Sequence, residues 1–100
     1  TPRRVCTMHA ATVDPDRANQ IAATNRISAK WTNPIILADF NLGTPTVRKS
    51  FPGRIMADAR VTTDGGSYLD GVVGSVTATA KPISSSDHHA VIATVPKATS

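Results

Sequence analysis

The sequence lacks glutamate altogether, and it contains one cysteine and only four aromatic residues. Its seven acidic residues are therefore all aspartates. The single cysteine, Cys6, cannot form an internal disulfide, and we expect a buried free thiol because it lies in an apolar stretch. With so few aromatic side chains, Phe51 and Tyr68 are expected to pack in the core rather than to stack on bases.

No apolar run approaches the roughly 18 to 20 residues that a membrane span requires, so no transmembrane segment is expected. The 40% hydrophobic content excludes an intrinsically disordered chain. The first residues, TPRRVCTMHA, contain no signal segment and have the character of a strand interior, so we expect a piece cut from a longer domain. The residues do not indicate a cellular compartment.

At 100 residues and 10.5 kDa, the chain is predicted to form a single domain over residues 1–100, without repeats or linkers. Its net charge is +4, and much of this charge lies between the motifs ADFN and YLDG, on Arg48, Lys49, Arg54 and Arg60. A polyanionic partner is compatible with this charge. Solubility alone explains it more simply than phosphate binding does.

A strand, a helix and a second strand are predicted for the first part of the chain. Residues 3–9 have strand character, and a helix is expected over residues 14–31, which open on the Asp-Pro pair typical of a helix start. The apolar residues 35–38 follow as a buried strand. Such a unit joins parallel strands, so we expect their carboxyl ends, with His9 and Asp39, at one edge of the sheet.

Residues 41–66 are rich in proline and glycine and are expected to form loops, with a short helix near residues 52–58. The segments SYLDGVVGS, VTATAK and HAVIATV then predict a three-stranded antiparallel meander. The first and third strands of a meander run in the same direction, which brings Asp70 to the edge that carries Asp87 and His88. We therefore predict a hydrogen-bond distance, roughly 2.6 to 3.2 Å, between the side chains of Asp70 and His88.

The motifs occur in an order that resembles one known group of enzymes. They are a histidine that closes a strand (His9), an R..Q pair in the helix (Arg17 and Gln20), ADFN, YLDGVVGS and a terminal SDHHAV. Over residues 3–95 this order resembles the C-terminal half of the endonuclease/exonuclease/phosphatase superfamily. The resemblance implies an α/β (α+β) fold, the C-terminal half of a four-layer α/β/β/α sandwich, with one mixed β-sheet and one long helix.

In that family two sheets pack face to face, and this chain has strands for one sheet only. We therefore expect the apolar residues of IILA, GVVGSV and AVIATV on one sheet face to be exposed, or to be buried in an oligomer. Two positions depart from the family pattern: Ala38 replaces a glycine, and Gly71 replaces an aromatic residue or a histidine. We expect Gly71 to remove a side chain from the edge of the site.

The resemblance implies that the chain hydrolyses phosphate esters with an activated water molecule. Asp39 would orient and deprotonate the water, and Asn41 would donate its amide to a phosphoryl oxygen. His88 would contact the phosphate, while Asp70 would accept its other ring proton and favour the imidazolium form. His9 would supply a second donor or protonate the leaving group.

The resemblance further implies a magnesium or manganese ion (Mg²⁺ or Mn²⁺), for which Asp87 would provide an oxygen ligand. The principal ligand in the family is a glutamate of the N-terminal half, and this chain has no glutamate. We therefore expect an incomplete enzyme with little activity and a metal affinity no better than about millimolar. The expected partners are a phosphate ester, namely a nucleic acid, phospholipid or inositol phosphate, and the missing N-terminal half of the domain.

Other interpretations use the same residues. A truncated or degenerate relative would act as a non-catalytic phosphate-binding or structural module. A zinc site of Cys6, His9, His88 and His89 lacks the usual ligand spacing, and no G-x-S-x-G sequence supports a serine nucleophile. Because neighbouring residues of an extended chain point to opposite faces, we expect His89 to lie on the surface when His88 faces the site.

Overall fold

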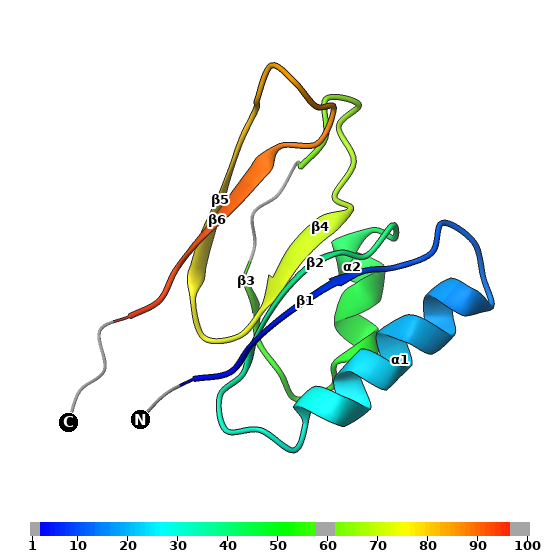
Figure 1. Ribbon diagram of the computed structural model, residues 1–100, viewed down its shortest axis with the longest axis vertical. Helices are drawn as coiled ribbons and strands as arrows, with labels where there is room; N and C mark the ends of the chain where they lie inside the picture. The colour runs from blue at the N-terminus through cyan, green and yellow to red at the C-terminus, as the bar shows by residue number, and fades with distance from the viewer. Residues whose placement is uncertain (1–2, 58–61, 97–100) are drawn as a thin grey trace.

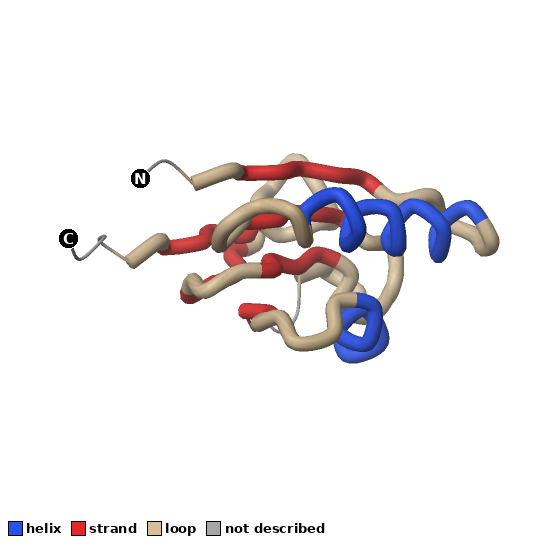
Figure 2. Tube along the Cα trace, turned by 90° about the horizontal axis from the view of Figure 1, so that it is seen from below, coloured by secondary structure: helices blue, strands red, loops and turns tan. Residues whose placement is uncertain are grey.

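The computed structural model describes residues 3–57 and 62–96. They form a small α+β structure with a four-stranded mixed sheet, a separate two-stranded sheet and two short helices (Figure 1). The elements in chain order are β1 (Val5–His9), α1 (Asp16–Ser28), β2 (Ile35–Asp39), α2 (Thr44–Val47), a 3₁₀ turn η1 (Arg48–Ser50), β3 (Met56–Ala57), β4 (Asp70–Val73), β5 (Thr77–Lys81) and β6 (Ala90–Thr94). Figure 2 shows α1 and α2 as separate segments rather than as one continuous layer of helices.

The strand-helix-strand prediction is confirmed for β1, α1 and β2. β1 and β2 are parallel neighbours, with Val5 paired to Ile35 and His9 paired to Asp39. This register aligns the carboxyl ends of the two strands, as expected when a helix connects parallel strands. The predicted common edge of His9 and Asp39 is therefore present.

Helix α1 is shorter than expected, and the prediction of one long helix is wrong. It covers 13 residues and ends at Ser28 rather than near Trp31. The Asp14 carboxylate accepts the backbone N–H of Ala18 at 3.2 Å, so Asp14 does support the start of the helix. Just beyond the other end, the N–H groups of Lys30 and Trp31 bond to carbonyls only three residues earlier, and Asn33 adopts a positive φ of 46°. Tightened turns of this kind end the helix.

The three-stranded meander predicted for residues 67–95 is wrong. β4 pairs antiparallel with both β2 and β3, whereas in the described part of the chain β5 pairs only with β6. Residues 71–73 are all buried, as expected for a central strand, while β5 alternates between exposed and half-buried residues. After β4, Gly74 adopts a φ of 146° and donates its N–H to the carbonyl of Ile55. The chain therefore turns away before β5 could pair with β4.

The loop between β2 and β4 contains helical turns, but not where they were expected. α2 and η1 lie at residues 44–50, with Pro45 near the start of α2. Residues 52–57 form a turn and the short strand β3 instead of the predicted helix, and residue 58 lies outside the described residues. Pro52 and Gly53, whose φ is 71°, favour a turn at this point.

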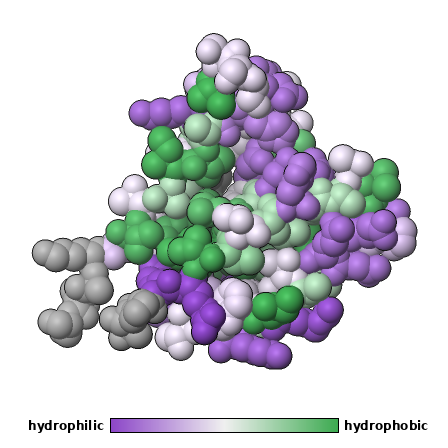
Figure 3. Space-filling model, in the orientation of Figure 1, coloured by the Kyte–Doolittle hydropathy of each residue, from purple (hydrophilic) through white to green (hydrophobic). Residues whose placement is uncertain are grey.

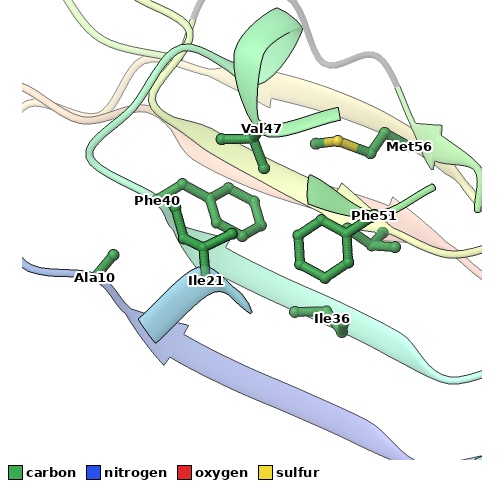
Figure 4. Packing of buried hydrophobic residues seen from close by; sticks show 8 residues of the cluster. Ala10, Ile21, Ile36, Phe40, Val47, Phe51 and Met56 are labelled. Carbon is green, nitrogen blue, oxygen red and sulfur yellow. The ribbon is translucent and has the colours of Figure 1, made fainter. Parts of the chain in front are cut away.

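The hydrophobic core lies between the sheet and the two helices. Figure 4 shows Ile21 of α1 and Val47 of α2 near Phe40, Phe51 and Ile36. Each of these five side chains is at most 1% exposed. The rings of Phe40 and Phe51 meet edge to face, with their centroids 6.0 Å apart. Because Phe40 directly follows β2, this packing anchors the strand end at the candidate site.

The opposite face of the sheet is covered in part, so the expectation of a bare face is wrong for Ile35 and Val72. Alternation along the strands places Ile35, Leu37 and Val72 on this face, and Ile35 and Val72 are 3% and 0% exposed. The β5–β6 hairpin contributes to the cover through β6, which contacts β4. The expectation holds elsewhere: Val5 of β1, the register partner of Ile35, is exposed, and so is Ile92 of the AVIATV segment in β6. Figure 3 shows apolar residues gathered over the middle of the face that it views.

A second large sheet is not present among residues 3–57 and 62–96, so the four-layer sandwich stays a prediction. Within the same ranges, no helix combines the length and the hydropathy that crossing a membrane would need. The described residues therefore confirm the α+β class and the mixed sheet, with the hairpin as an additional two-stranded sheet.

Candidate active site

Four of the predicted site residues meet at one edge of the sheet. Asp39 ends β2 and pairs in register with Asp70, the first residue of β4, while His9 pairs with Asp39 from the other side. A parallel neighbour ends and an antiparallel neighbour begins at the same edge, which explains why residues distant in the sequence come together. His88 approaches this edge from the segment before β6.

The predicted pairing of Asp70 and His88 is confirmed. Nδ1 of His88 lies 2.8 Å from Oδ2 of Asp70, and Nε2 of His88 lies 3.8 Å from Oδ2 of Asp39. The chain does not bring His88 to Asp70 through the predicted meander. Instead, an isolated antiparallel bridge between Thr63 and His88 holds the segment before β6 in place. The imidazole therefore lies between two carboxylates and is bonded to the nearer one.

The surroundings of His88 favour its protonated form. The hydrogen bond with Asp70 raises the pKa of His88 above its ordinary value, burial opposes the shift, and the negative charges of Asp70, Asp39 and Asp87 add to it. The His88 side chain is 33% exposed, so a ligand in solution can reach it. An imidazolium donates from both ring nitrogens, which leaves Nε2 available when Nδ1 is bonded to Asp70.

The carboxylate of Asp39 is oriented by its own strand end. The backbone N–H of Asn41 donates to Oδ1 of Asp39 at 2.9 Å, and Nε2 of His9 lies 3.4 Å from Oδ2. The His9 side chain is 75% exposed, whereas that of Asp39 is 21% exposed. Asp39 is thus fixed and partly shielded from water, while His9 lies at the open side of the edge.

Asn41 ties the ends of β1 and β2 together. Its side-chain amide donates to the carbonyl of Ala10 at 2.6 Å, and its own backbone carbonyl accepts from Nη1 of Arg17 at 2.7 Å. Gln20 makes a contact of the same kind, since its Oε1 accepts the backbone N–H of Ala11 at 2.7 Å. The R..Q pair and Asn41 thus position the loops around the site. The expected amide-to-phosphate contact would use the second N–H of Asn41.

Asp39, Asp70 and His88 form a group whose potential metal-ligating atoms all lie within 4.8 Å of one another. Mg²⁺ and Mn²⁺ prefer oxygen ligands, so the donor set fits such an ion through the two carboxylates. Asp87, the expected ligand, is exposed and does not belong to this group. Cys6 does not belong to it either, so the zinc alternative gains no support within the described ranges.

Thr62 is a site residue that the sequence interpretation missed. It is 0% exposed, and its hydroxyl accepts the backbone N–H of Asp70 at 3.1 Å. Its backbone carbonyl accepts the N–H of His89 at 2.6 Å, so Thr62 links β4 to the segment that carries the histidines. The TTDGGS turn was the only signal in the sequence, and a turn of this kind does not indicate which strand it contacts.

The expectation that His89 lies on the surface is wrong. Its side chain is 12% exposed, and its Nε2 lies 3.0 Å from Oδ1 of Asp64. It borders a pocket of about 280 Å³ together with Asp39, Asp70 and apolar residues of the neighbouring strands. Contact with the Thr62–Ser67 turn buries His89, which local alternation along the strand could not reveal.

Gly71 faces the core rather than the site. A Cβ atom at this position would lie 3.0 Å from Thr44, 3.1 Å from Met56 and 3.2 Å from Phe40. The expectation that Gly71 opens the edge of the site is therefore wrong, because a side chain would collide with the core instead. Ala38, the register partner of Gly71, is half-buried and packs against the same core.

Comparisons with protein-family models, with curated proteins and with solved structures found no match for this chain. The resemblance to the endonuclease/exonuclease/phosphatase superfamily therefore stays a prediction. The basis for proposing a function is the geometry of the sheet edge that carries Asp39, Asp70, His88 and His9, here called the Asp39 edge.

Proposed function

We propose that this chain carries the hydrolytic edge of a metal-dependent phosphoesterase, which cleaves phosphodiesters or phosphomonoesters with an activated water molecule. The observation that supports the proposal is the convergence of Asp39, Asp70 and His88, whose ligating atoms lie within 4.8 Å of one another. Two carboxylates and an imidazolium offer a base, a donor to a phosphate and ligands for a divalent ion in one place.

In this proposal Asp39 accepts the proton of the attacking water, and the N–H of Asn41 holds its carboxylate in place. His88 donates through Nε2 to a phosphoryl oxygen, because Asp70 already holds its Nδ1. His9, which is exposed beside Asp39, donates to a second oxygen or to the leaving group. An Mg²⁺ or Mn²⁺ ion held by the carboxylates would supply positive charge that stabilises the phosphoryl oxygens.

A second candidate function is a non-catalytic phosphate-binding module. The observation that favours it is the small number of metal ligands: the group contains two carboxylates, and the chain contains no glutamate. So few charged ligands hold a divalent ion weakly. In this alternative His88 and His9 bind a phosphate without hydrolysis. Full activity would need a further ligand from another polypeptide segment, as the family resemblance implies.

Hydrolysis of bis(p-nitrophenyl) phosphate in the presence of Mn²⁺ tests the proposal. Asp39→Asn and His88→Gln should each reduce the metal-dependent rate by about 100-fold or more, as is typical when a general base or a charged donor is removed. Asp16→Asn removes an exposed carboxylate of α1 and should retain the wild-type rate. Unchanged rates in Asp39→Asn or His88→Gln would overturn the phosphoesterase. Phosphate binding at His88 without any turnover would support the non-catalytic module instead.

A further inference from the structure

A pocket of about 450 Å³ lies at the opposite end of β2 from Asp39. It opens between the last turn of α1, the segment before β2 and the turn at residues 52–55. Pro34 lines the pocket just before β2 begins, so the length of the strand separates it from the candidate active site. Its volume falls in the range of small-molecule sites, roughly 300 to 1,000 Å³.

Arg54 lines this pocket with an incompletely paired positive charge. Its Nη1 donates to Oγ of Ser28 at 2.7 Å and to Oδ1 of Asn25 at 3.2 Å, and both partners are uncharged. Its Nη2 is buried and has no hydrogen-bond partner among residues 3–57 and 62–96. Burial lowers the pKa of Arg54, as expected for a cation withdrawn from water. A buried donor on a charged group is costly to leave unpaired, and an acceptor brought by a ligand would remove that cost.

A second arginine, Arg3, contacts a wall residue of the pocket without lining the pocket itself. Nε of Arg3 donates to the carbonyl of Asn33, a lining residue, at 2.9 Å, and Nη2 of Arg3 is buried without a partner in the part of the chain that the structure describes. Arg4 lies over the ring of Trp31, another lining residue, at 5.3 Å. No aspartate of the described ranges lines the pocket. The guanidinium of Arg54 thus lines a pocket whose described walls carry no negative charge, and two more arginines contact residues of its wall.

Part of the remaining wall is apolar and carries flat side chains, beside the polar Asn25, Ser28, Asn33 and Ser75. Trp31, Pro34, Pro52 and Ile55 are among its lining residues. Apolar walls with a few placed polar groups are typical of sites for ring-containing small molecules. A guanidinium presents paired donors that match the oxygens of a phosphate. The two features together select a ligand with a phosphate at one end and a planar ring at the other.

We propose that this pocket binds a small phosphate-bearing ligand with a planar ring, of the nucleoside monophosphate class. The phosphate accepts hydrogen bonds from Arg54 after a rotation of its flexible side chain, and the ring lies against Trp31 and the prolines. The proposal is independent of the hydrolytic function, because none of the pocket residues belongs to the Asp39 edge.

Titration of the ¹⁵N-labelled chain with adenosine 5′-monophosphate, followed by NMR, tests this site. Saturable shifts are expected for the indole N–H of Trp31 and for Nε of Arg54. Adenosine lacks the phosphate and inorganic phosphate lacks the ring, so each should bind at least about tenfold more weakly, a difference of roughly 1.4 kcal/mol. Arg54→Gln should weaken binding by a similar factor. Arg48→Gln removes the same charge from an exposed position outside the pocket and should have no effect.

Because Arg54 also bonds to α1, a second variant keeps the test decisive if Arg54→Gln fails to fold. Ser75 is exposed and lines the pocket, so the phenyl group of Ser75→Phe should block entry without changing the melting temperature. Nucleotide shifts that centre on His88 instead of Trp31 would overturn the proposal. Binding that survives Ser75→Phe would also overturn it, and so would equal affinities for inorganic phosphate and the nucleotide.

Discussion

Asp39 and Asp70 face one another across the β2–β4 pair at the edge of the sheet, with side chains that are 21% and 14% exposed. Like charges directly opposite on neighbouring strands destabilise a sheet. His88 bonds to Asp70 and lies 3.8 Å from Asp39, so its positive charge offsets this repulsion. At this edge the fold therefore tolerates an electrostatic strain that a cation relieves.

Asp70→Asn is expected to lower the pKa of His88, because the hydrogen bond to the Asp70 carboxylate is the main cause of the upward shift. NMR titration of the His88 ring protons in the metal-free chain measures the change. Asp64→Asn is the matched control, since Asp64 bonds to the neighbouring His89. An identical His88 pKa in wild type and Asp70→Asn would show that the bond does not form in solution.

The same pair predicts how stability depends on pH. The folded-state pKa of His88 lies above its unfolded value, so protonated His88 stabilises the fold fully below an unfolded pKa of about 6.5. This contribution is lost as the pH rises through the raised, folded-state pKa. Urea unfolding of wild type and His88→Gln should therefore give the larger difference in free energy of unfolding on the acid side. A difference that does not vary with pH would contradict the prediction.

Gly71→Ala is expected to lower the free energy of unfolding by about 1 to 3 kcal/mol, the usual cost of overpacking a core. The added methyl group would lie 3.0 Å from Thr44 and 3.1 Å from Met56. Gly65→Ala is the control, because its methyl group would meet only Oγ1 of Thr63 at 4.0 Å and should change stability by less than about 0.5 kcal/mol. If chemical denaturation gives both variants the same stability, Gly71 is not packed as described.

Thr62→Val removes the hydroxyl that accepts the N–H of Asp70 while it keeps the shape of the side chain. Leaving that part-buried N–H without its acceptor should cost about 1 to 3 kcal/mol in unfolding free energy. The loosened Asp70 should also lower the pKa of His88, which NMR can measure. Thr62→Ser keeps the hydroxyl and should restore both properties. A wild-type His88 pKa in Thr62→Val would limit Thr62 to a role in folding.

Calorimetric titration with Mn²⁺ is expected to give a dissociation constant no lower than about 1 mM, because charge count and rigidity set the affinity of such sites. Asp39→Asn and Asp70→Asn should each abolish the binding. Asp87→Asn should have a small effect, since Asp87 lies outside the group of close ligand atoms. Micromolar binding by the wild-type chain, or binding that depends on Asp87 alone, would contradict this prediction.

Local patterns were sufficient for the elements whose neighbours are close in the chain. The apolar runs of β1 and β2 and the Asp-Pro start of the helix predicted a parallel pair, and with it the common edge of His9 and Asp39. A connection of this type has one strongly preferred handedness, so few arrangements compete with it.

The position of β4 could not be predicted in this way. A short apolar strand followed by two more strands fits a meander as well as it fits the centre of a sheet, because local pattern does not say which strand is the partner. The tertiary structure decided the question: β4 lies between β2 and β3, and residues 71–73 are buried, as expected for a central strand covered on both faces.

In the candidate site, too, local sequence patterns predicted some contacts and only the tertiary structure decided others. The residue types and their order predicted that Asp70 and His88 would meet, and they do, by a route through Thr63 rather than through a meander. The sequence by itself determined which acids and histidines are available and that they follow strand ends. Only the tertiary structure decided the roles of Thr62 and His89, because strand pairing and register set the contacts of each side chain.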